Sequence, residues 1–199
     1  MIHRILHIGE EPLRKESEEI TRIDDDLRKL AADMFETMYK AHGCGLAAPQ
    51  IGVNKRLIVL DTDNEHRFVM INPEITKSSG KEICEEGCLS LPGLREKVQR
   101  ATKITARYTD LDGQQMEVTA EGLLARAIQH EIDHLEGVLF VDRISKARRM
   151  QIRHEIEILE RGGTLETEEE VEEGAEESAN AGESANASEG EAKAEPIAG

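Results

Sequence analysis

The sequence has few cysteines and no long apolar run. Its three cysteines, Cys44, Cys84 and Cys88, are an odd and sparse set for a secreted protein stabilised by disulfides. The N-terminal stretch MIHRILHIGEEPLRKESEEI turns acidic and meets a proline too early for the apolar region of a signal peptide. No segment approaches the roughly 20 apolar residues that a membrane-spanning helix needs. We therefore expect a cytoplasmic protein without a membrane partner.

The C-terminal segment lacks the side chains that build a hydrophobic core. Residues 164–199 contain twelve glutamates, one lysine and no aromatic residue, which is −11 of the net charge of −16, so residues 1–163 carry −5. Such a segment cannot bury enough apolar surface to offset the conformational entropy lost on ordering it. We predict a folded domain over residues 1–163 and a disordered, acidic, low-complexity tail over residues 164–199.

Apolar periodicity and turn signals predict the secondary structure. Apolar residues recur at spacings of three and four between residues 24 and 41, as on the buried face of a helix. An Asp-Gly pair at 112–113 lies between two alternating segments and indicates a β-hairpin. GCGLAAPQIG at 43–52 has three glycines and a proline, so we expect a loop there. The predicted helices span residues 24–41, 121–136 and 142–161, and the predicted strands span residues 56–61, 67–71, 103–109 and 115–120.

The order of these elements indicates the fold class. Helices and antiparallel strands are mixed without the regular rhythm of β-α-β units. We therefore expect an α+β fold, in which antiparallel sheets pack around the central helix 121–136. One further helix precedes this arrangement and one follows it.

The central helix carries the sequence QHEIDH. His130 and His134 are four residues apart, so their imidazoles project from one helix face and can hold a single cation. Glu131 is rotated off that face, where its carboxylate would reach a metal-bound water instead of the metal. Leu123 and Ala127 continue the histidine stripe and predict that it is apolar and buried. Two incidental histidines on a surface helix are the simpler alternative.

Several residues could provide the third ligand of such a metal site. Phe140 occupies the position at which a metzincin protease has its third histidine. Glu155 could complete a zinc endopeptidase site. Cys88, in the compact turn EGCLS, could instead complete a Cys-His-His site with room for water. Cys84 and Cys88 together with the two histidines would form a closed structural zinc site. For Cys44 and Cys84 we favour free, buried cysteines.

Three separated motifs resemble one enzyme family. GCGLAAPQIG at 43–52, EGCLS at 86–90 and QHEIDH at 129–134 are similar, in this order, to motifs of the peptide deformylases. The resemblance extends over about residues 3–160. It departs from the family pattern at Cys44, where a branched aliphatic residue is common, and it does not extend to the acidic tail.

The resemblance implies roles for individual residues. Cys88, His130 and His134 would bind the metal, and Glu131 would act as general acid and base. Gln50 and the backbone N–H of Leu89 would hold the oxyanion. The substrate-binding residues implied by the resemblance, or added as weaker candidates, are Gly43, Cys44, Gly45, Leu123, Ala127 and Arg95, and for Arg95 a surface ion pair is the favoured reading. Members of the family commonly use iron(II), so we expect Fe2+, with Zn2+, Ni2+ or Co2+ as replacements.

The expected substrates are nascent peptides that begin with N-formyl-methionine, which would be hydrolysed to formate and a free amine. The helix predicted over 142–161 carries Lys146, Arg148, Arg149 and Arg153. A basic helix suits phosphate contacts, so the ribosome is a possible partner, which the acidic tail would repel. We expect no binding to DNA.

Overall fold

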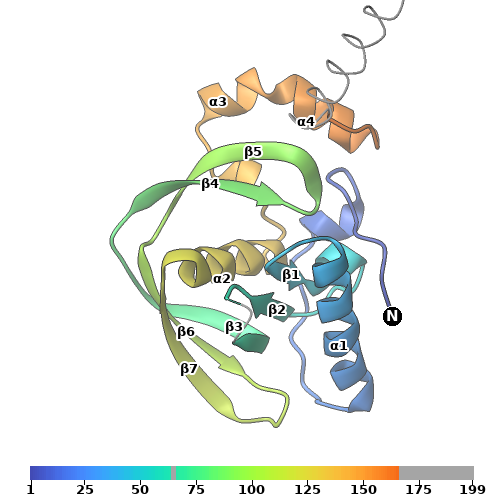
Figure 1. Cartoon of the computed structure of the whole chain (residues 1–199), viewed down its shortest axis with the longest axis vertical. Helices are drawn as coiled ribbons and strands as arrows, with labels where there is room; N and C mark the ends of the chain where they lie inside the picture. Colours follow the sequence, from blue (N-terminus) through green and yellow to red (C-terminus); the bar gives the residue numbers. More distant parts are fainter. Residues whose placement is uncertain (64–65, 166–199) are drawn as a thin grey trace, which may run out of the picture. The chain divides into compact units, whose positions relative to one another are not determined.

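A computed structural model describes residues 1–63 and 66–165. Residues Met1–Leu165 form one compact unit (Figure 1). The predicted acidic tail falls, from residue 166 onward, outside the described residues, so both its disorder and the domain boundary at residue 163 stay predictions. Within the described part of the chain, no helix is both long and apolar enough to cross a membrane.

The structure contains four α-helices and seven β-strands within the described residues. The helices are α1 (Asp25–Lys40), α2 (Gly122–Leu135), α3 (Lys146–Gln151) and α4 (Arg153–Glu160), with short 3-10 helices at Glu11–Arg14, Ala48–Ile51 and Phe140–Asp142. The strands are β1 (Gly45–Ala47), β2 (Leu57–Asp61), β3 (Arg67–Ser79), β4 (Glu82–Cys88), β5 (Leu91–Arg100), β6 (Lys103–Thr109) and β7 (Gln115–Glu121).

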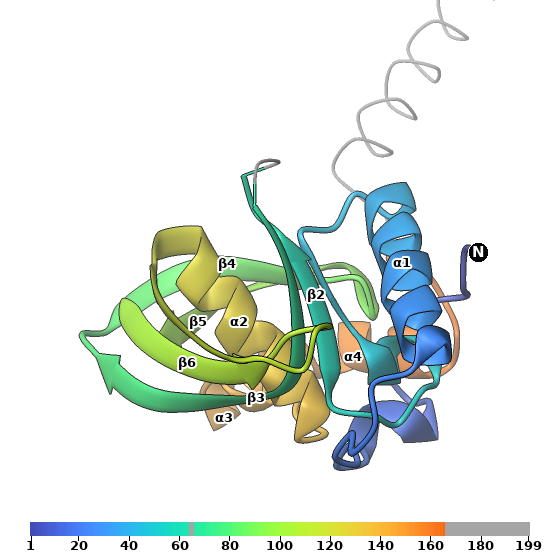
Figure 2. The ribbon, with the colours of Figure 1, turned by 90° about the horizontal axis from the view of Figure 1, so that it is seen from below.

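Two antiparallel sheets enclose helix α2. The larger sheet has the strand order β1-β2-β3-β6-β7, and the smaller one is the β4-β5 hairpin. Figures 1 and 2 both show α2 lying between the hairpin and the larger sheet, whereas α3 and α4 lie on the outer side of β5 in Figure 1. The predicted α+β class with antiparallel sheets is confirmed.

Strand β2 is buried on both of its faces, which explains its continuous apolar sequence LIVL. Side chains alternate along a strand, so Ile58 and Leu60 point into the cluster around α2, whereas Leu57 and Val59 point into the cluster beneath α1. The two helices are therefore held on opposite sides of one strand.

Helix α1 confirms the prediction from periodicity almost to the residue. The Asp24 carboxylate caps it by accepting a hydrogen bond from the Leu27 N–H at 3.0 Å. Ala31, Met34 and Met38 form the buried stripe that packs against β2. Acidic residues in its first turn and a lysine in its last turn complement the helix dipole.

Two local predictions were wrong or incomplete. The segment expected as a loop at 43–52 contains strand β1 and a 3-10 helix. The helix expected over 142–161 is divided at Ile152, which leaves helical geometry (ψ 17°) with its side chain buried. This break lets Ile152 and Leu159 pack into the same cluster as β5.

Strands β4 and β5 were not predicted, because several of their buried positions are occupied by charged residues. Glu86 lies on the inner side of β4, and Glu96 and Arg100 are buried on β5. Charges at core positions hide the period of two that signals a strand. The motif EGCLS is therefore the end of a strand followed by the hairpin turn, not an isolated turn.

A buried ion network joins the hairpin to α2. The Arg100 guanidinium donates to both carboxylate oxygens of Glu86, at 2.7 and 2.9 Å, and to Asp133 at 2.6 Å. The three side chains are only 5%, 8% and 7% exposed. Arg143, which follows α2, also donates to Asp133. Because buried charges must be paired, this network fixes how the hairpin sits on the helix.

The network also has a defined pH dependence. Burial alone would raise the pKa of Glu86, but hydrogen bonds from Arg100 and His130 outweigh it and lower the pKa from 4.5 to about 2. A depressed carboxyl pKa stabilises the folded state above the unfolded value of 4.5, and this contribution is lost as the pH falls toward 2.

We expect Arg100→Ala to lower the free energy of unfolding by about 3 to 5 kcal/mol at pH 7, because two buried carboxylates lose their partner. The difference in free energy of unfolding between Arg100→Ala and the parent protein should become smaller below pH 4.5, where Glu86 begins to gain a proton in the unfolded state. Urea denaturation at several pH values measures both effects. Arg107→Ala, which breaks an exposed pair with Glu74, is the control and should change stability by about 1 kcal/mol or less. Equal losses in the two variants would contradict the prediction.

Candidate active site

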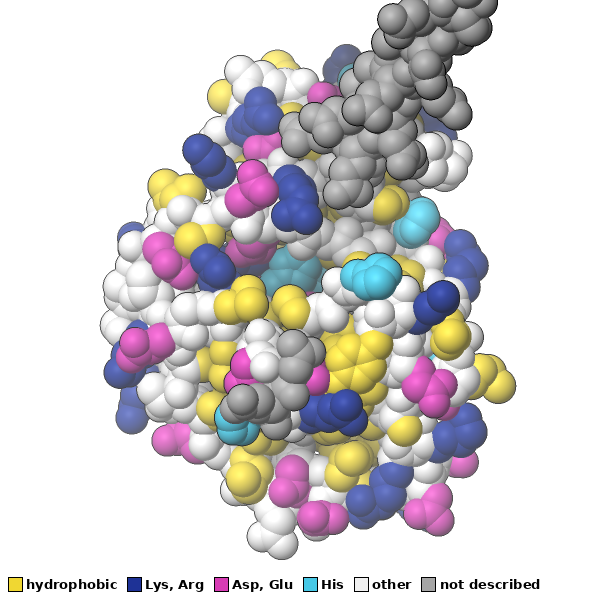
Figure 3. Space-filling model, viewed as in Figure 1, with side chains coloured by type: hydrophobic (Ala, Val, Ile, Leu, Met, Phe, Trp, Pro, Cys, Tyr) yellow, Lys and Arg dark blue, Asp and Glu magenta, His cyan; other side chains and the backbone are white. Residues whose placement is uncertain are grey.

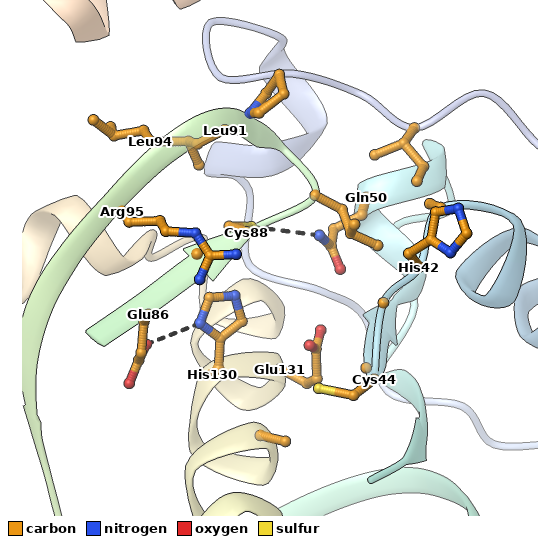
Figure 4. Close-up of a pocket in the computed structure, with 18 of the residues that line it drawn as sticks. His42, Cys44, Gln50, Glu86, Cys88, Leu91, Leu94, Arg95, His130 and Glu131 are labelled. Carbon is orange, nitrogen blue, oxygen red and sulfur yellow. Dashed lines mark hydrogen bonds and ion pairs between the residues drawn. The ribbon is translucent and has the colours of Figure 1, made fainter. Parts of the chain in front are cut away.

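A cleft of about 750 Å³ opens beside the N-terminal half of α2. Its walls come from the segment between α1 and β1, from the β4-β5 hairpin and from α2. Figure 3 shows a hollow on this face with a histidine side chain at its base. Figure 4 shows that the labelled side chains from these elements converge on one space.

Three possible metal ligands meet at the cleft. One atom each from Cys88, His130 and His134 lies within 4.8 Å of the others. The Cys88 Sγ is 3.2 Å from the His134 Nε2, and the two imidazole rings are 5.0 Å apart. The helix supplies both histidines at the spacing of one turn, and the end of β4 brings the thiol to them.

The donor set fits a transition-metal ion. One thiolate and two imidazoles are ligands for zinc, iron, nickel or cobalt, and three protein ligands leave a coordination position open. His134 is buried, and burial, followed by the charges of His130 and Arg100, lowers its pKa. It is therefore a neutral imidazole that can donate a lone pair to a cation.

Glu86 orients His130. Its Oε2 lies 3.0 Å from the His130 Nδ1 (Figure 4), so the Nδ1 carries the proton and the Nε2 faces Cys88. The sequence analysis did not identify Glu86 or Arg100. The available signal was the spacing of Glu86 and Cys88, because residues two apart on a strand point to the same face.

Glu131 places a carboxyl group next to the ligand set. Its side chain lines the cleft although the residue is only 4% exposed, and its Oε2 has no hydrogen-bond partner among the described residues. Burial raises the pKa of Glu131 from 4.5 to about 7, against the lowering effect of His130. A carboxyl group with this pKa can exchange a proton at neutral pH.

Gln50 and Leu89 lie next to Cys88, Gln50 through a side-chain contact and Leu89 as its neighbour in the chain. The Gln50 Oε1 accepts a hydrogen bond from the Ala47 N–H at 2.8 Å, which directs the Nε2 toward the Cys88 Sγ at 3.7 Å (Figure 4). The Nε2 also donates to the Ser90 hydroxyl at 3.2 Å. Leu89 lines the cleft in the turn between β4 and β5.

Comparison with known proteins shows which family this chain is similar to. The sequence pattern of the family described as polypeptide deformylase matches residues 2–150. A peptide deformylase from Acidobacterium capsulatum is 48% identical over 167 residues, which cover 82% of this chain and 98% of the relative. The crystal structure of a peptide deformylase from Legionella pneumophila is 47% identical, with a TM-score of 0.76 over 81% of this chain and 96% of that one.

The chain belongs to the polypeptide deformylase family. It is therefore an enzyme of the class that removes the N-formyl group from nascent peptides. A peptide deformylase from Thermus thermophilus, 40% identical with a TM-score of 0.77 over 81% of this chain and 99% of that one, has a similar fold.

The remaining residues predicted for the deformylase site also line the cleft, namely Gly43, Cys44, Gly45, Leu123, Ala127 and Arg95. Leu123 is 46% exposed, so the prediction that the whole histidine stripe is buried was wrong at its first residue. The Arg95 side chain is 72% exposed and lies 3.6 Å from Glu85, as the surface ion-pair reading predicted.

The solvent exposure of two cysteines differs from the prediction. Cys44 is exposed and Cys84 is partly exposed, so the prediction that both are buried was wrong, although both are free. Although the residue is exposed, its thiol is partly shielded from solvent in the cleft, and this desolvation, followed by the charge of Glu131, raises the pKa of Cys44. Within residues 1–63 and 66–165, neither Cys84 nor Glu155 belongs to a group that could hold a metal. The structural zinc site and the endopeptidase site therefore find no support.

Gly45 makes room for Glu131. A Cβ atom on Gly45 would overlap the Glu131 Oε1 and would lie 3.0 Å from the carboxyl carbon. Contacts this close force one of the two groups to move. The missing side chain at residue 45 therefore determines where the carboxyl group of Glu131 can lie.

We expect Gly45→Ala to lower kcat for formate release by on the order of a hundredfold, since a displacement of about 1 Å at a catalytic group has this effect. The bound metal should be retained, because no ligand moves. Gly87→Ala is the matched control in the same cleft, where a Cβ would make an ordinary contact of 3.6 Å with Arg95. Equal kcat values for the two variants would show that Glu131 is not held by this contact.

Proposed function

We propose that the chain hydrolyses the formyl group of N-formyl-methionyl peptides with a divalent cation held by Cys88, His130 and His134. The observation that carries the proposal is the close approach of these three ligand atoms beside a cleft that Cys88, His130 and Glu131 line, together with the unpartnered carboxyl oxygen of Glu131. We favour Fe2+, with Zn2+, Ni2+ or Co2+ as replacements that the same donor set accepts. When bound, such an ion acts as a Lewis acid and lowers the pKa of a coordinated water toward about 7.

Residues of the chain itself would transfer the proton and stabilise the negative charge that develops during the reaction. Glu131 would accept the proton of the attacking water and later donate it to the leaving nitrogen. Its pKa of about 7 allows the carboxyl group both to gain and to lose a proton near neutral pH. The Gln50 amide and the Leu89 N–H would donate to the oxygen that becomes negative at the formyl carbon. Each such donor typically stabilises the transition state by about 3 to 4 kcal/mol.

The substrate would bind along strand β1. This strand is the first in the sheet order and pairs only with β2, so its other edge is open within the described residues. A peptide could add to this edge with its backbone beside Cys44 and Gly45. The methionine side chain would then contact the apolar wall formed by Leu123 and Ala127. Gly43 leaves space for the Leu89 side chain, because a Cβ there would come within 2.8 Å of it.

The test is release of formate from formyl-Met-Ala-Ser under anaerobic conditions, with metal analysis of the same preparation. We expect Cys88→Ala to lose both metal and activity, and Cys84→Ala, the matched control on the same strand, to keep both. Glu131→Gln should keep the metal and lose activity by about 10²- to 10⁴-fold. Full activity in Cys88→Ala would refute the proposed ligand set, and cleavage of unformylated peptides would indicate an endopeptidase.

We also propose a contact with the ribosome through α3 and α4, in the cytoplasm where nascent chains emerge. Three of the four basic residues expected to make it are paired with acids: Arg148 with Glu96, Arg149 with Asp142 and Arg153 with Glu157. Only the Glu96 carboxylate is buried among these partners, so the other two pairs are weak in water. The helices therefore present fewer unpaired charges than their sequence indicates.

We expect the double variant Lys146→Ala, Arg153→Ala to co-sediment with ribosomes less than the parent protein at low salt. Removal of residues 166–199 should strengthen co-sedimentation, because the tail is acidic. Arg107→Ala is the control. Like each substitution in the double variant, it removes one exposed positive charge, but Arg107 lies on strand β6, outside α3 and α4. No difference between the variants across salt concentrations would contradict the contact.

A further inference from the structure

Cys44 presents a thiol to the cleft from a fixed position. It is the exposed cysteine among the three, and its carbonyl accepts a hydrogen bond from the Asp61 N–H at 2.9 Å. Cys44 lies immediately before β1, and this hydrogen bond continues the pairing of β1 with β2. In Figure 4 its sulfur points toward Glu131.

A second observation indicates what kind of group fits beside this thiol. Glu131 lines the same cleft, and its Oε2 is buried and has no hydrogen-bond partner among the described residues. A buried oxygen of this kind favours a ligand that brings an N–H donor. A short group attached to the Cys44 sulfur and ending in an amine or amide would bring such a donor into the space beside Glu131.

The other two thiols are less suited to the same reaction. The Cys88 Sγ contacts His134 and accepts hydrogen bonds from Gln50 and from the Ser90 N–H, and it belongs to the ligand set. Cys84 lies on β4 and is not among the described residues that line the cleft.

We propose that Cys44 is a site of reversible thiol modification, at which a small disulfide bearing an amine or amide attaches and closes the cleft to substrate. The Cys44 sulfur attacks one sulfur of the disulfide, the disulfide bond breaks, and a mixed disulfide forms at Cys44. The second half leaves as a thiol and takes up the proton that Cys44 gave up, so the exchange needs no outside oxidant. A reducing thiol reverses it. The block of catalysis rests on the proposed deformylase function, whereas the attachment itself does not.

The test uses the full chain loaded with zinc and an excess of cystamine, the disulfide of 2-aminoethanethiol. Excess is needed because the raised pKa of Cys44 slows the exchange. Peptide mapping by mass spectrometry locates the adduct, metal analysis follows the zinc, and formate release follows activity. We expect an adduct on Cys44, zinc retained, activity lost in proportion to the fraction modified, and recovery with dithiothreitol.

Two comparisons make the experiment specific. Cys44→Ser should take up no cystamine in the cleft and should keep its own untreated activity after treatment, whereas Cys84→Ser should respond like the parent protein. Bis(2-hydroxyethyl) disulfide, which has no amine, should modify Cys44 more slowly than cystamine if Glu131 receives the donor.

The proposal is overturned if Cys44 carries no adduct, if the adduct forms without loss of activity, or if activity is lost through modification of Cys88 with release of zinc. Failure of the deformylase function looks different, because untreated protein would then release no formate. Mapping of the adduct would still decide whether Cys44 takes the disulfide.

Discussion

The ion network around Arg100 is the constraint on which the rest of the site depends. One guanidinium holds Glu86 on the hairpin and Asp133 on the helix, and Glu86 in turn fixes the His130 ring. Because all three charged side chains are buried, the hairpin cannot shift on α2 without leaving a charge unpaired. The same contacts that join the two layers therefore also set the orientation of a possible metal ligand.

Helix α2 separates a structural face from a chemical one. Ala125 and Ile128 face the larger sheet and contribute to its core, whereas His130 and Glu131 line the cleft. A helix buried on one side by a sheet and on the other by a hairpin holds its side chains with little freedom. This rigidity suits catalysis, which depends on groups kept close to their productive positions.

Much of the site could be predicted from sequence, because its residues are concentrated in three short motifs. The spacing of His130 and His134 follows directly from helix geometry, and the resemblance to deformylases selected Cys88 from several open alternatives. The fold class and α1 followed from apolar periodicity. Strands β4 and β5 could not be found in this way. Charged residues such as Glu86 and Arg100 occupy buried positions on these strands, so the sequence does not show the alternation of apolar and polar residues that indicates a strand.

Long-range contacts account for the other differences. The break at Ile152 depends on packing against β5, which no local signal records. Burial of Cys44 was predicted from residue type, yet its exposure depends on the cleft that distant segments form around it. The steric role of Gly45 depends on a carboxyl group 86 positions away in the chain.

The three possible metal ligands come from two different elements, so binding of a metal would be linked to folding. Cys88 lies on the hairpin and both histidines lie on α2, so an ion bound to all three would cross-link the layers that the Arg100 network already joins. An ion that binds only the folded arrangement shifts the unfolding equilibrium toward the native state by mass action. Thermal denaturation of this chain should then report how much of a preparation is loaded, before any substrate is added.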